Sequence, residues 1–217
     1  MNLDLFGNEE EPSTQTLEEG AVLLRRFACH IEQELLGAIE EISQAAPFRK
    51  MKTPGGHQMS VAMTNCGPAG WVTDKKGYRY SSTDPLTDQP WPPIPEIFFD
   101  LARHAAREAQ FEGFEPDACL INRYEAGARM GLHQDRDEAD LSAPIVSLSL
   151  GLPARFLLGG FTRGDSSQKV DLRHGDVFVF GGPSRLRYHG IAPLKGGQHR
   201  LTGPFRYNVT FRQALSL

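Results

Sequence analysis

The stretch FRYNVTFR, residues 205–212, alternates polar and apolar side chains without interruption. A period of two is typical of a β-strand with one apolar face, and it places Arg206 and Arg212 together on the polar face. An ordinary strand with a solvated outer face is the alternative interpretation. Two guanidinium groups on one face repel each other, however, unless an anion lies between them, and a dicarboxylate would satisfy both.

Upstream of this stretch, strand-like segments recur and are separated by glycine-rich turns. We expect strands at residues 119–124, 145–150, 155–158, 169–172, 177–180, 186–188 and 205–211. This rhythm predicts an antiparallel sandwich or jelly roll. In the segment 118–124, Asn122 and Tyr124 have a spacing of two, so an amide and a phenol would project toward the same ligand.

The N-terminal half of the chain differs from this pattern. Residues 27–46 and 95–109 carry apolar side chains at helical spacing, so we expect two helices that buttress the outer sheet. Residues 51–93 between them are rich in Gly, Pro, Thr and Asp, with strand-like pieces at 59–64 and 77–81. A segment this irregular within a compact domain is usually disordered or functional, and we interpret it as a substrate-recognition lid.

One short motif has the composition of a metal site. His133 and Asp135 are two residues apart, and His189 follows much later in the chain. If residues 132–135 are extended, His133 and Asp135 project from the same side. Two imidazoles and one carboxylate occupy one face of an octahedron around a non-haem iron and leave three positions open. An acidic loop that begins with a histidine is the alternative interpretation.

The chain contains a second His-x-Asp sequence, His174-Gly175-Asp176. Apolar segments flank it at 170–172 and 177–180, and its glycine lies where a tight hairpin needs a permissive backbone. We therefore interpret this second sequence as a turn and not as a metal site.

Length and composition are those of one globular domain. The chain has 217 residues, of which 40% are hydrophobic, and we expect a flexible segment at 1–20 followed by a single domain at 21–217. The three cysteines lack CxxC spacing, which predicts neither a disulfide framework nor a zinc ribbon. No basic start precedes a long apolar stretch, so we expect no membrane span, and a monomer in the cytoplasm.

The net charge of −4 gives no basic field for binding phosphates. Positive charge is concentrated locally, at 49–52 and 75–79, where a solvated charged face is the alternative interpretation. These basic runs bracket the aromatic residues Trp71, Tyr78 and Tyr80. Stacking combined with scattered cations is how proteins hold single strands and flipped bases, so we expect weak, salt-sensitive binding of nucleic acid.

Taken together, these motifs resemble the signature of the AlkB family of oxidative nucleic-acid demethylases. The motifs are His133-x-Asp135-x-Asp137, the distal His189 and Arg206-x5-Arg212. Further stretches that resemble the family lie at 54–56, 60–67, 120–124, 144–147 and 207–213, and the likeness runs from about residue 21 to residue 214. The resemblance implies an α+β, mainly β fold: a double-stranded β-helix (jelly roll) core, two buttressing N-terminal helices and a nucleotide-recognition lid at about 51–93.

The resemblance also implies roles for individual residues. Fe(II) would be bound by His133, Asp135 and His189. The co-substrate 2-oxoglutarate, used together with O2, would be bound by Asn122, Tyr124, Arg206, Asn208 and Arg212. Contacts to the alkylated base would come from Trp71, Tyr78, Asp137 and Arg163, and Tyr80 joins them because it lies among the same aromatic residues.

The implied activity is repair of N-alkylated bases, 1-methyladenine and 3-methylcytosine, in single- or double-stranded DNA, with RNA as a further candidate. The alkyl group is hydroxylated and leaves as formaldehyde. Such methylation leaves a cationic ring that unstacks at lower cost, that Trp71 can stack on, and that the charge of Asp137 attracts. Two alternatives stay open. One is a 2-oxoglutarate oxygenase that acts on protein or small molecules, and the other is a jelly roll that holds a metal without turnover.

Overall fold

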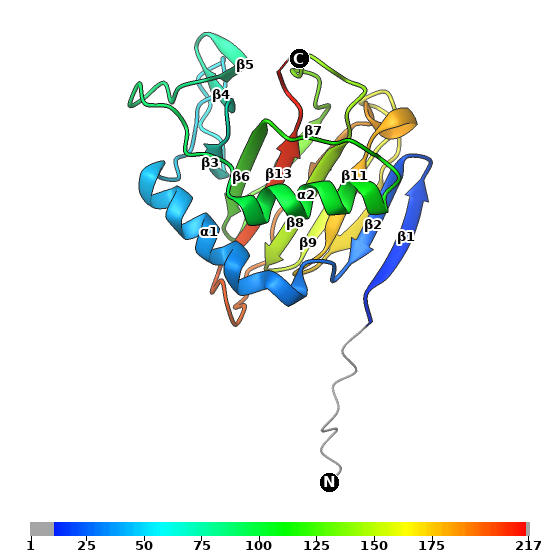
Figure 1. The fold of residues 1–217 in the computed structure, drawn as a ribbon. Coiled ribbons are helices and arrows are strands. Elements are labelled where there is room, and N and C mark those ends of the chain that lie inside the picture. The colour runs from blue at the N-terminus through cyan, green and yellow to red at the C-terminus, as the bar shows by residue number, and fades with distance from the viewer. Residues whose placement is uncertain (1–10, 216–217) are drawn as a thin grey trace.

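The computed structural model describes residues 11–215 and contains two facing antiparallel sheets (Figure 1). The larger, seven-stranded sheet has the order β1 (Ser13–Glu18), β2 (Ala21–Arg25), β11 (Val177–Phe180), β8 (Ile145–Gly151), β13 (Arg206–Arg212), β6 (Ala118–Tyr124) and β3 (Ala62–Cys66). The smaller, four-stranded sheet has the order β10 (Gln168–Leu172), β9 (Ala154–Leu158), β12 (His189–Ile191) and β7 (Met130–His133).

The space between the two sheets is filled by the inward-facing side chains of both. One buried cluster joins Ile145 and Phe178 of the larger sheet to Phe156, Leu158 and Val170 of the smaller one. Because side chains alternate along a strand, each sheet contributes one apolar face to this layer. The two-layered antiparallel core confirms the predicted jelly roll.

Two helices cover the outer face of the larger sheet (Figure 1). Helix α1 (Glu32–Ala45) follows a short 3-10 turn at Cys29–Ile31, and helix α2 (Glu96–Glu108) follows Pro95, whose fixed φ suits a helix start. Both predicted helices are thereby confirmed. Within residues 11–215, no helix has both the length and the apolar character needed to cross a membrane.

A hairpin of β4 (Gly70–Asp74) and β5 (Gly77–Ser81) stands beside the core, next to β3 (Figure 1). The Asn65 side chain holds its first strand, because its Oδ1 accepts from the Trp71 N–H and its Nδ2 donates to the Trp71 carbonyl. A Cβ at Gly70 would lie 2.5 Å from the Trp91 ring, so this close approach requires glycine. The predicted lid therefore contains a regular hairpin, and its residues 62–66 belong to the larger sheet.

Two expectations about these parts of the chain were wrong. Ser13–Glu18 forms β1 and pairs with β2, so the N-terminal segment predicted to be flexible at 1–20 is a sheet edge over these residues, while 1–10 lie outside the described residues. The strand expected at 186–188 begins three residues later, at His189–Ile191, because a 3-10 turn occupies Gly182–Ser184 just before it. Strands β2 and β4 were not predicted.

Candidate metal centre and adjoining cavities

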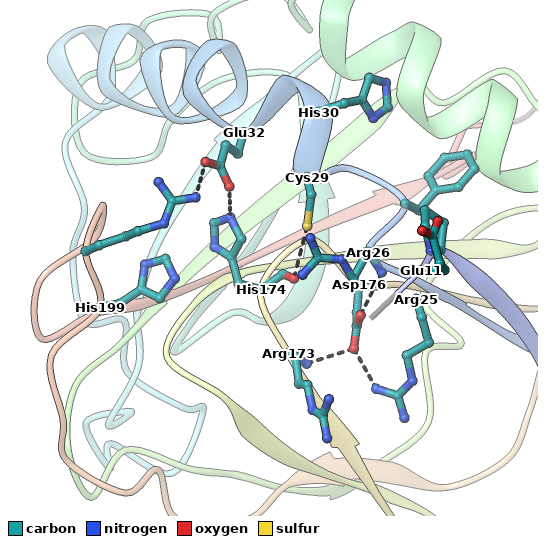
Figure 2. A pocket seen from close by; sticks show the side chains of 13 residues that line it. Glu11, Arg25, Arg26, Cys29, His30, Glu32, Arg173, His174, Asp176 and His199 are labelled. Carbon is teal, nitrogen blue, oxygen red and sulfur yellow. Dashed lines mark hydrogen bonds and ion pairs between the residues drawn. The ribbon is translucent and has the colours of Figure 1, made fainter. Parts of the chain in front are cut away.

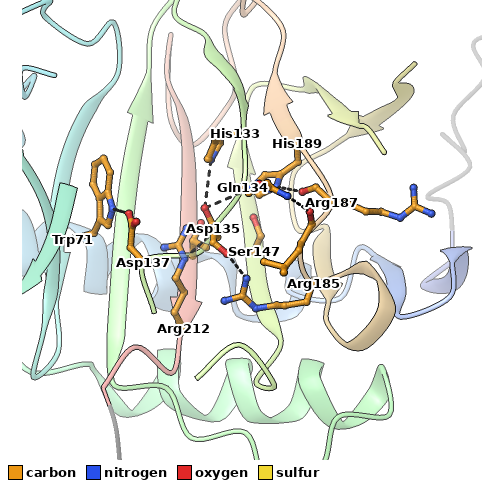
Figure 3. Close-up of polar contacts among 12 residues, drawn as sticks. Trp71, His133, Gln134, Asp135, Asp137, Ser147, Arg185, Arg187, His189 and Arg212 are labelled. Atoms are coloured by element: carbon orange, nitrogen blue, oxygen red, sulfur yellow. Dashed lines mark hydrogen bonds and ion pairs between the residues drawn. The ribbon is translucent and has the colours of Figure 1, made fainter. Parts of the chain in front are cut away.

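Three side chains converge at the mouth of the sandwich. His133 ends β7 and His189 begins β12, and these two residues face each other in the antiparallel register, with ring centroids 4.4 Å apart. Asp135 follows two residues after His133, and the ligand atoms of all three lie within 4.8 Å of one another (Figure 3). Among residues 11–215, these three are the histidine, cysteine or acidic side chains whose ligand atoms lie close enough together to hold one metal ion.

Backbone carbonyls fix the orientation of both imidazole rings. His133 Nδ1 lies 2.8 Å from the Gly131 carbonyl, and His189 Nδ1 lies 3.1 Å from the Arg187 carbonyl. A carbonyl only accepts, so each Nδ1 carries the proton and each Nε2 keeps its lone pair. These Nε2 atoms lie 3.5 and 3.8 Å from Oδ1 of Asp135. Metal-binding histidines are commonly oriented in this way, so the ring geometry fits a metal ion.

The electrostatics of Asp135 and His189 also suit a cation. Burial alone would raise the pKa of Asp135, but the Arg212 guanidinium and the two histidines hold it well below its ordinary range. Burial, together with the neighbouring His133, lowers the pKa of His189 to about 4. Two imidazole nitrogens and one carboxylate oxygen on one side of an open site match the ligand set of non-haem Fe(II).

A cavity beside the three ligands is lined by every residue predicted to bind 2-oxoglutarate. These residues are Asn122, Tyr124, Arg206, Asn208 and Arg212. They come from β6 and β13, which pair with Tyr124 opposite Arg206 and Asn122 opposite Asn208. The alternation of β13 therefore directs its polar face into the sandwich, and the solvated outer face was the wrong alternative.

Arg206 is the group in this cavity that most clearly requires a ligand. Its side chain is 1% exposed, its Nη2 donates to Ser149 Oγ at 3.0 Å, and its guanidinium lies 5.0 Å from the centroid of the Tyr124 ring. Its Nε and Nη1, like Oδ1 of Asn122, have no hydrogen-bond partner within the described part of the chain. Unused buried donors on a cation are costly, and a carboxylate would satisfy the fork.

Arg212 is engaged differently, although it was predicted to bind the same co-substrate. Its Nε and Nη2 donate to Oδ2 of Asp135 at 3.0 and 2.6 Å (Figure 3). These bonds hold the Asp135 carboxylate so that Oδ1 is left facing the two imidazoles. Arg212 therefore acts on the metal ligand as well as lining the cavity.

A second cavity, of about 380 Å³, adjoins the first and shares His133 and Asp135 in its lining. The predicted base-contacting residues all line it: Trp71, Tyr78, Tyr80, Asp137 and Arg163. The rings of Trp71 and Tyr78 are stacked, with centroids 5.6 Å apart, and Trp71 Nε1 donates to Oδ2 of Asp137 at 3.1 Å (Figure 3). A flat aromatic surface, a carboxylate and a cation thus face one cavity next to the metal ligands.

Two charged residues of the site were missed by sequence reasoning. Neither Glu138 nor Arg185 was singled out in the sequence, yet both are buried. The hydroxyl of Tyr80 donates to Glu138 Oε1 at 2.6 Å, and both residues line the second cavity. The acids at Asp135, Asp137 and Glu138 are conspicuous in the sequence, but nothing in it shows that Glu138 is buried or that Arg185 is its partner.

The second His-x-Asp sequence is a turn between β10 and β11, as predicted, with Gly175 at a φ of +79°. His174 Nδ1 accepts from the Gly151 N–H at 2.9 Å, and its Nε2 lies 2.7 Å from Glu32 (Figure 2). Its ring also stacks on that of His199 at 4.5 Å. These contacts tie two turns to the start of α1, which explains the conspicuous histidine without a metal.

Comparisons with known proteins agree with this geometry. A family model described as the 2OG-Fe(II) oxygenase superfamily matches residues 20–212. Proteins named alpha-ketoglutarate-dependent dioxygenase AlkB from Salmonella typhimurium strain LT2 and Escherichia coli strain K12 are 58% and 56% identical to this chain, each over 98% of both sequences. The solved structure of OsALKBH1 matches with a TM-score of 0.81 and 32% identity, covering 93% of this chain and 100% of that one.

The ligand triad, the arginine-lined cavity and these full-length matches lead to one assignment. The chain belongs to the 2OG-Fe(II) oxygenase superfamily and, within it, to the AlkB family of Fe(II)- and 2-oxoglutarate-dependent dioxygenases.

Proposed function

We propose that this dioxygenase is an oxidative demethylase that repairs N-alkylated bases, with 1-methyladenine and 3-methylcytosine in DNA as substrates and RNA as a further candidate. The observation that carries the proposal is the second cavity, where the Trp71–Tyr78 stack and the Asp137 carboxylate face the metal ligands. A flat cationic ring is the kind of ligand that an aromatic stack beside a carboxylate attracts.

Methylation at the pairing edge favours this cavity in two ways. It weakens base pairing, so a damaged base leaves the helix at lower cost than a normal base. It also leaves a positive charge, which stacking on Trp71 stabilises by about 0.5–2 kcal/mol, depending on desolvation. Asp137 lies 3.1 Å from the indole N–H and adds a negative charge at the rim of the same ring.

His133, Asp135 and His189 would hold Fe(II) through two Nε2 atoms and Oδ1. When bound, Fe(II) supplies the oxidation in which 2-oxoglutarate, O2 and the N-alkyl group become succinate, carbon dioxide and an N-hydroxyalkyl group. The hydroxylated product then breaks its bond to nitrogen and releases formaldehyde and the unmodified base. Arg212 contributes by holding Oδ2 of Asp135, which keeps the other carboxylate oxygen free for the metal.

The co-substrate would lie in the cavity between the sheets. We assign its far carboxylate to Arg206 and Tyr124, because Arg206 Nε and Nη1 are unpartnered there within residues 11–215. Asn122 and Asn208 line the same cavity and would satisfy the remaining polar atoms. Both residues are buried, which helps to keep water out of the site.

The nucleic acid would approach from the side of the β4–β5 hairpin. Tyr78 is half exposed at 50%, and the Arg163 guanidinium lies 5.6 Å from the centroid of the Tyr188 ring at the edge of the cavity. We assign contacts with the strand to these two residues, and single- and double-stranded alkylated DNA as partners. The proposal includes action as a monomer in the cytoplasm. The free thiols of Cys66 and Cys119 fit a reducing compartment.

Formaldehyde release tests the proposed substrate. The protein, Fe(II) and 2-oxoglutarate are incubated with an oligonucleotide that carries one 1-methyladenine, with the same oligonucleotide unmodified, and with an N-methylated peptide. We expect formaldehyde, with matching loss of the methyl group, from the methylated oligonucleotide alone. Release from the peptide, with none from the oligonucleotide, would instead support an oxygenase that acts on protein.

A further inference from the structure

Glu138 is a buried carboxylate that has no part in the reaction described above. Its side chain is 2% exposed and lies in the loop that follows β7, three residues beyond Asp135. Two donors surround it, the Tyr80 hydroxyl at 2.6 Å and Arg185 Nη2 at 3.1 Å, and Arg212 forms an ion pair with it, with Nε 3.2 Å from Oε1. A carboxyl group is buried at little cost only when partners offset its lost hydration. The hydroxyl and the two guanidinium groups are such partners for Glu138.

The two arginines that bind Glu138 also bind the metal ligand Asp135. Arg212 donates to Oδ2 of Asp135 at 2.6 and 3.0 Å. Arg185 donates through Nη1 to the Asp135 backbone carbonyl at 2.5 Å (Figure 3). Its Nε donates to the Ala143 carbonyl at 3.0 Å. Two guanidinium groups and two carboxylates therefore form a buried, charge-balanced cluster that fixes both the side chain and the backbone of Asp135.

The third partner of Glu138 comes from the hairpin that carries the aromatic stack. Tyr80 lies on β5, directly across from Trp71 on β4 in the antiparallel register. Burial and the neighbouring carboxylate of Glu138 raise the pKa of Tyr80, so its hydroxyl stays protonated and donates. A path of short polar contacts thus runs from the hairpin through Tyr80, Glu138 and Arg212 to Oδ2 of Asp135.

We propose that Glu138 is a positioning residue that couples the placement of the β4–β5 hairpin to the orientation of the Asp135 carboxylate toward the metal. The two bonds to Oδ2 fix the rotation of that carboxylate, and Arg212 can make them only while its guanidinium is held in its plane. Charge-assisted hydrogen bonds in a buried setting are strong and directional enough to do this. This inference concerns the metal ligand and the hairpin, and it stands whichever substrate the enzyme uses.

Coupling of this kind is reciprocal: if the hairpin affects the metal ligand, the metal must affect the hairpin to the same degree. The test therefore uses metal binding alone. Metal-free protein is titrated with Co(II) or Mn(II) in the absence of 2-oxoglutarate and nucleic acid. A negative result here is distinguishable from failure of the proposed demethylase activity, because neither substrate is present.

The first variant is Tyr80→Phe, which removes one hydroxyl and keeps the ring. We expect about three-fold weaker metal binding, and about ten-fold weaker binding in Glu138→Gln, since loss of a residue that orients a metal ligand typically costs 10–100-fold in affinity. In the Glu138→Gln background, Tyr80→Phe should have no further effect, because the path is already broken. The matched control is Tyr207→Phe, on the opposite face of β13, whose hydroxyl has no hydrogen-bond partner among residues 11–215.

Hydrogen exchange of the hairpin gives the second readout. Addition of Mn(II) should slow amide exchange of residues 70–81 in the wild-type protein and leave it unchanged in Glu138→Gln. If Glu138→Gln does not fold, the Tyr80→Phe titration and the exchange of the wild-type hairpin decide the question. Metal affinity of Tyr80→Phe equal to that of the control, additive effects in the double variant, or wild-type exchange that ignores the metal would each overturn the proposal.

Discussion

Replacement of Arg206 by lysine should weaken the binding of 2-oxoglutarate with little effect on the metal centre. Arg206 is 1% exposed, and its Nη2 donates a hydrogen bond to Ser149 Oγ. Its Nε and Nη1 have no hydrogen-bond partner within the part of the chain that the structure describes. Lysine keeps the positive charge but offers a single nitrogen on a flexible stem. It can no longer satisfy the co-substrate carboxylate with a planar fork.

The size of the effect follows from the bonds that are lost. A hydrogen bond to a charged group contributes about 1.5–3 kcal/mol, and about 1.4 kcal/mol corresponds to a factor of ten in affinity. Loss of one such bond predicts a KM for 2-oxoglutarate that is about 10- to 150-fold higher. The value of kcat at saturating 2-oxoglutarate should fall much less, because the Arg206 side chain does not contact the three metal ligands.

Succinate formation measured against 2-oxoglutarate concentration separates KM from kcat in this variant. The matched control is Arg200→Lys, since Arg200 is 66% exposed and pairs with Glu32 near the start of α1. Thermal unfolding of both variants shows whether they are folded. A KM for Arg206→Lys within two-fold of the wild-type value, or an equal rise in Arg200→Lys, would refute the assignment of the Arg206 fork to 2-oxoglutarate.

Three further changes have definite expected outcomes. His133→Ala should abolish turnover and Mn(II) binding, and succinate formation at the wild-type rate would count against its place in the triad. Asp137→Ala should reduce the preference for cationic methylated bases over neutral ones, measured by formaldehyde release, while 2-oxoglutarate is still decarboxylated; an unchanged preference would show that Asp137 does not read charge. Burial raises the pKa of Glu32, but Arg200 and the adjacent histidine lower it below its ordinary value of 4.5. The stabilisation of the folded protein by the Glu32 carboxylate is therefore present above pH 4.5 and is lost as the pH falls through the lowered pKa. The difference in Tm between wild type and Glu32→Gln should shrink below about pH 4.5. A difference in Tm that stays constant with pH would contradict the lowered pKa.

Much of the fold could be predicted because the relevant signals are local. Strand β13 was expected at 205–211 and lies at Arg206–Arg212, since its alternation is uninterrupted. The edge strand Ser13–Glu18 gave no such signal, because all but one of its residues are polar and it buries little. Strand β12 was predicted too early in the sequence, because Leu186 and Tyr188 have the apolar alternation of a strand but lie just after a 3-10 turn.

The candidate site divides in the same way. The metal ligands, and the grouping of Asn122, Tyr124, Arg206, Asn208 and Arg212 around one cavity, could be anticipated because residue type, spacing and family resemblance all pointed to the same side chains. The cluster around Glu138 could not, because its partners Tyr80 and Arg185 lie 58 and 47 residues away in the sequence. Only the folded chain brings them together, and a lone acidic residue carries no sign of which cations it will meet.

The metal centre is tested most directly by a visible absorption spectrum recorded without oxygen, first with Fe(II) and then with 2-oxoglutarate added. The wild-type protein should develop a charge-transfer band only after the second addition, and His189→Ala should show none. A wild-type spectrum without this band, or the same band in His189→Ala, would contradict the assignment of His133, Asp135 and His189 as the ligands of an iron ion that 2-oxoglutarate chelates.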